Sequence, residues 1–215
     1  MLTIYGSDLS APAIKVRLTA SYLGLDYKWH LVNLREGEHK QEWFLKINPV
    51  GKVPAIDDNG FYLFESNTIC KYLADKHESA LYPKEIHQRA VVDQWIDYIS
   101  FHVSANLMPV VYNRVFAPRM GRMVNERAIT EGLEFLKQYL PLLEDRLARQ
   151  AQVVGSTITL ADIVLLSVLE PAEVALFDLG AYPKLSAWRV ALKQQKFYSN
   201  CYKEYGEMLK APSGR

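Results

Sequence analysis

The chain has 215 residues, 49% of them hydrophobic, and its 25 basic and 24 acidic side chains leave a formal net charge of +1. That composition can bury a substantial core in one large or two small domains. No basic patch is dense enough for nucleic acid, no apolar run reaches the length of a membrane span, and the first residues lack a signal-peptide pattern. The two cysteines, Cys70 and Cys201, lie in no metal-binding spacing. We therefore expect a soluble cytoplasmic protein with reduced thiols, without a metal site and without a nucleic-acid or membrane partner.

Short apolar runs alternate with helical periodicity through the first 78 residues. The pattern predicts, in order, a strand over 2–5, a helix over 12–23, a strand over 27–32, a short helix over 40–45, strands around 53–56 and 61–64, and a helix over 66–77. The sequence Asp57-Asp58-Asn59-Gly60 predicts the turn that joins the last two strands in a hairpin. This order indicates an α/β unit with a mixed four-stranded sheet.

Beyond this unit the pattern is helical, without a convincing strand. The segment 79–84 interrupts the periodicity, and we expect it to link a domain over 1–78 to an all-helical domain over 85–215. A long helix is predicted by one apolar stripe, formed by Leu133, Leu136, Leu140, Leu143 and Leu147. Pro141 should bend this helix or break it.

A helix start is indicated by Thr159-Leu160-Ala161-Asp162, which has the spacing of a capping box with Asp in place of the usual Glu or Gln. Ile158 and Ile163 are placed to form a hydrophobic staple across the same start. Both features are structural and carry no chemistry. The tail over 211–215 is the one segment that we expect to be disordered.

The dipeptide Val53-Pro54 is the clearest sign of a ligand site. A proline within an apolar strand run cannot donate to a ladder, so it belongs at an edge or a turn, and cis peptide bonds are almost confined to such positions. The backbone N–H and C=O of Val53 are then free. A short extended peptide could pair with them as an added antiparallel strand.

Glu65 and Ser66 fall at the start of the predicted helix that follows. The N-terminus of a helix attracts a carboxylate, to which the Ser66 hydroxyl can also donate, while Glu65 can pair with an ammonium group. A ligand with an α-amino acid head followed by a peptide unit suits this arrangement. Taken singly, Pro54 could merely end an edge strand and Ser66 could merely cap a helix, but their combination favours a site.

These residues resemble those of a cytosolic glutathione transferase along the whole chain. The resemblance rests on Tyr5, Ser10-Ala11-Pro12, His39-Lys40, the run from Asn48 to Pro54, Glu65-Ser66, and the all-helical second half. The spacing of Tyr5, Ser10 and Pro12 is similar to the theta class, and Glu38-His39-Lys40 is similar to the phi class, both of the serine type. The resemblance implies a thioredoxin-like domain that binds glutathione, a helical domain that contributes the pocket for the electrophile, and a homodimer.

The resemblance also implies roles for individual residues. Val53 would pair with the cysteinyl backbone of glutathione, with a cis bond before Pro54. Glu65 and Ser66 would take the γ-glutamyl ammonium and carboxylate. The residues expected near the glycyl end are His39, Lys40 and Lys52, although either lysine could equally be an ordinary surface residue.

Catalysis requires a thiolate, because a thiol with a pKa of about 8.5 is a poor nucleophile at neutral pH. Ser10 precedes a predicted helix, so its hydroxyl and the positive helix end could stabilise the sulfur anion, although an ordinary N-cap is the alternative. Tyr5 is the rival donor, since tyrosine-type classes place their catalytic hydroxyl near the end of the first strand. A cysteine-type thiol transferase is disfavoured, because position 10 is serine. We expect Cys70 to be a buried core residue.

The electrophile pocket should be apolar. Its candidate residues are Leu9, Pro12, Met108, Val111, Tyr112 and Phe116. Such side chains are more often core than ligand contacts, and Arg114 nearby could steer an anion or form an ion pair. The expected activity is attack of the glutathione thiolate on apolar electrophiles in detoxification, by conjugation, dehalogenation or peroxide reduction. The alternative is a glutathione-binding or regulatory protein that keeps the transferase fold without catalysis.

Overall fold

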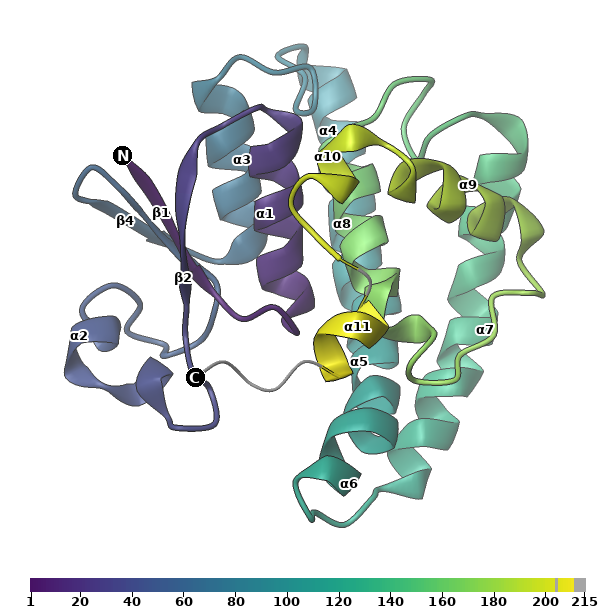
Figure 1. Ribbon diagram of the computed structural model, residues 1–215. Helices are drawn as coiled ribbons and strands as arrows, with labels where there is room; N and C mark the ends of the chain where they lie inside the picture. Colours follow the sequence, from purple (N-terminus) through teal and green to yellow (C-terminus); the bar gives the residue numbers. More distant parts are fainter. Residues whose placement is uncertain (204, 211–215) are drawn as a thin grey trace.

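The computed structural model describes residues 1–203 and 205–210 (Figure 1). The expected disordered tail over 211–215 lies outside them. Four strands form one sheet in the order β2-β1-β3-β4, in which β1 and β2 are parallel and the other pairs antiparallel. The strands are β1 (Leu2–Gly6), β2 (Tyr27–Leu31), β3 (Ala55–Asp58) and β4 (Phe61–Phe64). The mixed four-stranded sheet is confirmed, and the β3–β4 hairpin turns at Asn59 and Gly60, which both have positive φ.

The helices of this part are α1 (Ala11–Tyr22), α2 (Glu42–Leu45), which follows a 3-10 turn over Glu38–Lys40, and α3 (Ser66–Lys76). Alternation along β1 divides the side chains between two faces of the sheet. Ile4 belongs to the main core, which α1 and α3 share with the helical part, whereas Tyr5 packs with a smaller cluster around Phe44. This βαβαββα unit is the thioredoxin-like fold expected from the sequence.

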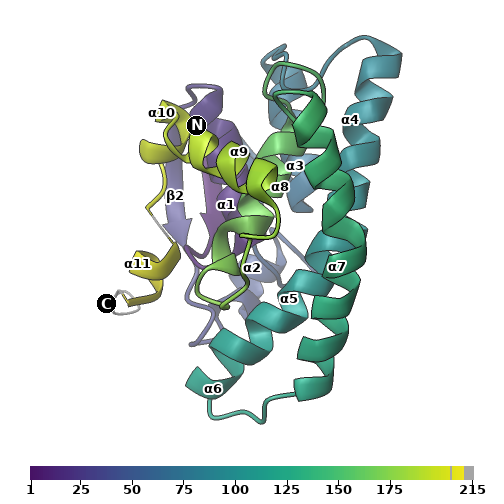
Figure 2. The same ribbon diagram turned by 90° about the vertical axis from the view of Figure 1, so that its right-hand side faces the viewer.

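The remainder of the described chain is helical. Its helices are α4 (Ile86–Tyr98), α5 (Ala105–Val111), α6 (Ala117–Arg119), α7 (Glu126–Arg149), α8 (Leu160–Leu169), α9 (Pro183–Lys193), α10 (Lys196–Ser199) and α11 (Tyr205–Lys210). Wide π turns over Ile99–Ser104 and Tyr112–Phe116 connect α4, α5 and α6. Figure 2 shows the sheet on one side, the helices α4, α5 and α7 on the other, and α8 between them. None of these helices combines the length and apolarity that a bilayer crossing requires.

The leucine stripe predicted for the long helix is buried in α7 at positions 136, 140, 143 and 147. Of the two outcomes expected at Pro141, a bend or a break, the break is wrong, because α7 continues through the proline to Arg149. Gly132 brings α7 close to α5, since a Cβ at this position would lie 2.6 Å from the backbone oxygen of Asn106. Packing along the stripe therefore outweighs the hydrogen bond that Pro141 cannot make.

The capping box at the start of α8 is present. The Asp162 carboxylate accepts hydrogen bonds from the backbone N–H of Thr159 at 2.8 Å and from its hydroxyl at 2.9 Å. Of the two isoleucines expected as a staple, Ile163 is buried in the main core and Ile158 is partly buried and packs against it.

Replacing Thr159 by alanine should lower the free energy of unfolding by about 1 kcal/mol, because the hydroxyl that completes the cap is lost. Urea denaturation followed by circular dichroism measures this change. A variant as stable as the wild type would show that the buried backbone bonds alone hold the start of α8.

Candidate functional site

The sheet register brings three of the predicted site segments to one end of the sheet. Tyr5 near the end of β1 pairs with Ala55 at the start of β3, and Ala55 pairs with Phe64 at the end of β4. The loop to α1 leaves β1 at this end, the dipeptide before Ala55 enters it, and α3 starts just after Phe64. Ser10, Val53-Pro54 and Glu65-Ser66 are therefore neighbours by topology, although they are far apart in sequence.

Ser10 is the N-cap residue of α1. Its side-chain oxygen accepts from the Ala13 N–H at 3.3 Å, and its backbone N–H donates to the Ser7 carbonyl at 3.0 Å. No acidic side chain lies in the first turn, so nothing on the helix itself neutralises its positive end. Because the cap uses Ser10 only as an acceptor, the hydroxyl proton is available to a ligand.

Tyr5, the rival donor, lies on β1 in an aromatic cluster. Its ring centroid is 5.1 Å from that of His30 and 6.1 Å from that of Trp43. Burial raises the pKa of Tyr5, and Asp57 and Tyr62 contribute less to the same shift. Asp57 on β3 and Tyr62 on β4 are paired in the hairpin. The smaller cluster in which Tyr5 packs also includes Val53 and Phe64, so Tyr5 lies at the same end of the sheet as Ser10.

Val53 does not belong to a strand, because β3 begins only at Ala55; the predicted strand start is two residues too early. The bond between Val53 and Pro54 is cis. Within the described chain, the N–H and C=O of Val53 have no hydrogen-bond partner. The preceding loop is held by the buried Asn48 side chain, whose Nδ2 donates to the Lys52 carbonyl at 2.6 Å and whose Oδ1 accepts from the Val50 N–H at 3.0 Å. A preformed loop therefore presents a free backbone edge.

A cavity of about 290 Å³ adjoins Val53. It is lined by Leu34, His39, Lys40, Gly51, Lys52 and Val53. It thus brings together the residues expected at the glycyl end, and it adds Leu34, an apolar loop residue that no spacing rule marked. The Nδ1 atom of His39 is buried and has no partner among the described residues. Burial, followed by the charge of Lys40, lowers the pKa of His39, so the positive charge here comes from the two lysines.

The start of α3 is open. Its N-cap residue is Glu65, whose side chain makes no capping hydrogen bond, and Ser66 is the first helical residue. Glu65 has a φ of +68°, a conformation that costs energy for a residue other than glycine and is often found at functional sites. The Ser66 hydroxyl and the first N–H groups of α3 therefore face a position where an anion can bind.

Lys15 was not predicted. Although its relative exposure is only 6%, its Nζ donates to Oδ1 of Asn67 at 2.7 Å, directly after Ser66. Asn67 donates in turn to Oγ of Ser100 at 3.1 Å. This chain of contacts joins α1, the start of α3 and the helical part. The sequence does not single Lys15 out, because α1 also contains Arg17, Thr19 and Ser21; only its burial shows that it requires a partner.

The residues expected around the electrophile differ in exposure. Pro12 is exposed, Leu9, Met108 and Phe116 are partly buried, and Tyr112 is 38% exposed and accepts from Nη1 of Arg122 at 2.8 Å. Val111 is only 2% exposed and packs in the main core, so it does not line the surface itself. Among the described residues Arg114 has no ion-pair partner, contrary to one expectation. Its Nη1 donates to the backbone carbonyls of Ala175 and Leu176.

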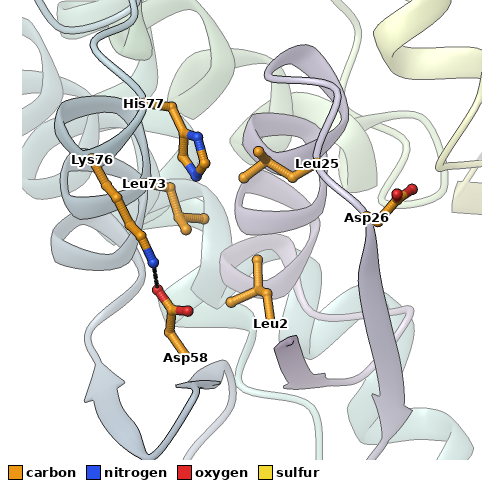
Figure 3. Close-up of a pocket in the computed structure, with 7 residues that line it drawn as sticks. All are labelled: Leu2, Leu25, Asp26, Asp58, Leu73, Lys76 and His77. Carbon is orange, nitrogen blue, oxygen red and sulfur yellow. Dashed lines mark hydrogen bonds and ion pairs between the residues drawn. The ribbon is translucent and has the colours of Figure 1, made fainter.

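A second cavity, of about 160 Å³, lies at the opposite end of α1, away from Ser10 (Figure 3). It is lined by Leu2, Leu25, Asp26, Asp58, Leu73, Lys76 and His77, with Lys76 and Asp58 paired across its edge. It contains none of the predicted site residues. Tyr72 also donates to the Asp58 carboxylate, so the polar groups of this cavity are largely satisfied by the protein itself.

Two family models match the chain. Residues 4–81 match the glutathione S-transferase N-terminal domain, and residues 105–196 match the glutathione S-transferase C-terminal domain. Both matches lie within the corresponding halves of the fold described above.

Individual plant proteins agree with this assignment. Glutathione S-transferase 1 of Zea mays is 32% identical over 90% of this chain and 92% of its own length, and glutathione S-transferase F10 of Arabidopsis thaliana is 34% identical over 79% and 80%. The structure of maize glutathione S-transferase I in complex with an atrazine–glutathione conjugate covers 99% of both chains at 30% identity, with a TM-score of 0.87. These plant enzymes are of the phi class, one of the two classes that the motifs suggest. The chain belongs to the glutathione S-transferase family.

Proposed function

We propose that this glutathione transferase binds glutathione at the end of the sheet where α1, Val53-Pro54 and α3 meet, and that Ser10 stabilises the thiolate for attack on apolar electrophiles. The observation that carries the proposal is the convergence of three unsatisfied elements. These are the free backbone of Val53, the uncapped start of α3, and the start of α1 at Ser10, whose first turn holds no acidic side chain.

Glutathione matches these elements from end to end. Its cysteinyl N–H and C=O pair with the backbone of Val53 as a short antiparallel strand. The γ-glutamyl carboxylate receives hydrogen bonds from Ser66 and the first turn of α3, and Glu65 pairs with the ammonium group. The glycyl carboxylate enters the cavity beside Lys40 and Lys52, where His39 has its unpartnered Nδ1.

Chemistry begins when the bound thiol loses its proton to solvent. The Ser10 hydroxyl then donates a hydrogen bond to the sulfur, and the positive end of α1 adds to the stabilisation. A hydrogen bond to a charged group contributes about 1.5–3 kcal/mol, and one pKa unit corresponds to about 1.4 kcal/mol. One or two units of pKa depression are therefore within reach. The thiolate forms a C–S bond to the electrophile, and either a leaving group departs with its electron pair or the addition product takes up a proton.

The electrophile binds next to the sulfur on an apolar surface formed by Leu9, Pro12, Met108, Tyr112 and Phe116, with Val111 beneath it. The maize relative that contains an atrazine–glutathione conjugate supports a substrate with an apolar ring and a halide leaving group. Soft aromatic and thioether side chains suit such a ring. The two domains have different roles. The domain over 1–78 binds glutathione, the segment 79–84 links the domains, and the domain over 85–215 supplies most of the surface that binds the electrophile.

Binding and turnover test the proposal together. Calorimetric titration should show one glutathione site per chain, and an activated aryl chloride should release chloride in a reaction that depends on glutathione. Absence of glutathione binding would refute the proposal. Binding without turnover of any aryl halide, epoxide or peroxide would instead indicate a protein that stores or senses glutathione.

The protein acts as a homodimer in the cytoplasm. Large apolar side chains that face water, among them Phe101, Phe61 and Tyr62 at 70%, 50% and 48% exposure, support a partner surface, because interfaces cover such residues. Cys70 and Cys201 are free, as reducing surroundings require. Sedimentation should give about twice the 24.6 kDa chain mass, and a single species at 24.6 kDa would contradict the dimer.

The cytoplasmic location is tested separately, by fractionating cells and assaying each fraction for the protein.

A further inference from the structure

The C-terminal segment of the described chain lies against the loop that carries Ser10. Oη of Tyr205 donates to the Leu9 carbonyl at 2.8 Å, and Oη of Tyr202 donates to the Asp8 carbonyl at 3.3 Å. Figure 1 shows α11 next to the start of α1, although almost the whole chain separates them in sequence. Both tyrosines are almost fully buried, so the contact belongs to the packed interior.

A third connection reaches the same loop from α1. Nη1 of Arg17 pairs with the Asp8 carboxylate at 2.7 Å, while its Nη2 donates to the Cys201 carbonyl just before Tyr202. The guanidinium also lies over the ring of Trp29, 4.5 Å from its centroid. Arg17 therefore joins the C-terminal segment to the loop at Asp8, next to the two tyrosine contacts.

The bond from Tyr205 has a direct geometric consequence for Ser10. The Leu9 carbonyl and the Ser10 N–H are the two ends of one peptide group, which is planar. Tyr205 holds the carbonyl end, and the Ser7 carbonyl holds the N–H end at 3.0 Å. With both ends held, this plane and the N–Cα bond of Ser10 are fixed. The following carbonyl of Ser10 is held by the N–H groups of Ala13 and Ile14, both at 2.8 Å, so the direction in which the Ser10 side chain leaves the backbone is set as well.

The Tyr205 hydroxyl is a donor to the Leu9 carbonyl and not an acceptor. Burial and the nearby Glu170 carboxylate raise the pKa of Tyr205, so its hydroxyl is protonated at neutral pH. A carbonyl oxygen can only accept, so the direction of this bond is fixed as well.

We propose that Tyr205 is a positioning residue for catalysis: by fixing the peptide group between Leu9 and Ser10, it aims the Ser10 hydroxyl at the sulfur of bound glutathione, with Tyr202 and Arg17 holding the loop at Asp8. This role rests on the proposed function of Ser10. Tyr205 itself makes no contact with glutathione in this scheme, and it acts through the backbone of the loop.

The test is Tyr205→Phe, compared with Tyr198→Phe as a matched control. Tyr198 is a buried tyrosine in α10 whose hydroxyl donates to Glu170 at 2.8 Å instead of to the loop. We expect Tyr205→Phe to raise the pKa of the bound thiol by about half a unit to one unit and to lower kcat about three- to tenfold, with less than about a twofold change in KM for glutathione. Tyr198→Phe should leave the thiol pKa and kcat within about twofold of the wild type.

A second readout does not depend on glutathione. Hydrogen exchange of the Ser10 amide should become faster in Tyr205→Phe and stay unchanged in Tyr198→Phe, and Tyr202→Phe should give a smaller effect in the same direction because its bond is longer. If exchange and the thiol pKa are both unchanged in Tyr205→Phe while Ser10→Ala still raises the thiol pKa, the positioning role is refuted and the proposed function stands. If the bound thiol of the wild type has an ordinary pKa, the proposed function fails, and the positioning role fails with it.

Discussion

Replacing Ser10 by alanine should lower kcat/KM for conjugation about ten- to hundredfold near pH 7. The variant lacks the hydroxyl that donates to the thiolate, and a hydrogen bond to a charged group is worth about 1.5–3 kcal/mol, with about 1.4 kcal/mol per factor of ten. The positive end of α1 remains, so the activity should be reduced but not abolished. Steady-state kinetics with an aryl halide over a range of glutathione concentrations measures the change.

The same substitution also removes the N-cap of α1, which costs about 1 kcal/mol of stability. Urea denaturation of the variant separates this loss from the kinetic effect, since the protein must remain folded under assay conditions. Ser7→Ala is the control, because Ser7 lies in the same loop but caps no helix and contributes only its backbone carbonyl to Ser10. Ser10→Ala with full activity would transfer the donor role to Tyr5 or to the helix end alone.

Replacing Asp162 by alanine should lower the free energy of unfolding by about 2–6 kcal/mol. Asp162 is fully buried and accepts from the N–H groups of Val153 and Thr159, both at 2.8 Å, and from the indole of Trp188 at 3.3 Å. Alanine leaves two buried N–H groups without an acceptor, and each costs about 1–3 kcal/mol. Because domains are stable by only about 5–15 kcal/mol, this is a large part of the total.

Chemical denaturation monitored by tryptophan fluorescence measures the loss. Asp145→Ala, which removes an exposed carboxylate from α7, should stay within about 0.5 kcal/mol of the wild type. A loss below about 1 kcal/mol for Asp162→Ala would mean that water enters the site and replaces the carboxylate.

The Asp162 carboxyl should also make stability depend on pH. Burial raises its pKa from 3.8 to about 6, outweighing the hydrogen bonds that it accepts. Between these values the folded state binds a proton that the unfolded state has released, so this contribution is fully present below about pH 4 and is lost as the pH rises through about 6. The difference in unfolding free energy between the wild type and Asp162→Asn should therefore decrease from pH 4 to pH 6. A difference that is constant or increases with pH would contradict the raised pKa.

Local patterns were sufficient to predict most of the fold. The helix over 12–23 was observed at Ala11–Tyr22, four of the five leucines of the stripe are buried, with Leu133 half-buried, and the capping box is present. These features depend on periodicity and on caps, which neighbouring residues determine. Errors arose where packing decided the outcome, as at Pro141, which lies inside an unbroken helix, and at Val53, which lies before the strand instead of in it.

The site could be predicted where one short segment carries one function. The segments at Ser10, Val53-Pro54 and Glu65-Ser66 are local, and the register of the sheet brings them to one end. Contacts between segments far apart in sequence could not be predicted in this way. Lys15 beneath the start of α3 and Tyr205 on the loop before Ser10 depend on the tertiary arrangement, and no spacing within the sequence marks either of them.

The thiolate absorbance of bound glutathione, followed as a function of pH in the wild type and in Ser10→Ala, tests the central claim most directly. The account predicts a bound thiol pKa one or two units below the value of about 8.5 for a free thiol, and a return toward that value in Ser10→Ala. An equal depression in both proteins would show that Ser10 is not the activating donor. A bound thiol that titrates like the free one in the wild type would contradict the proposed mechanism as a whole.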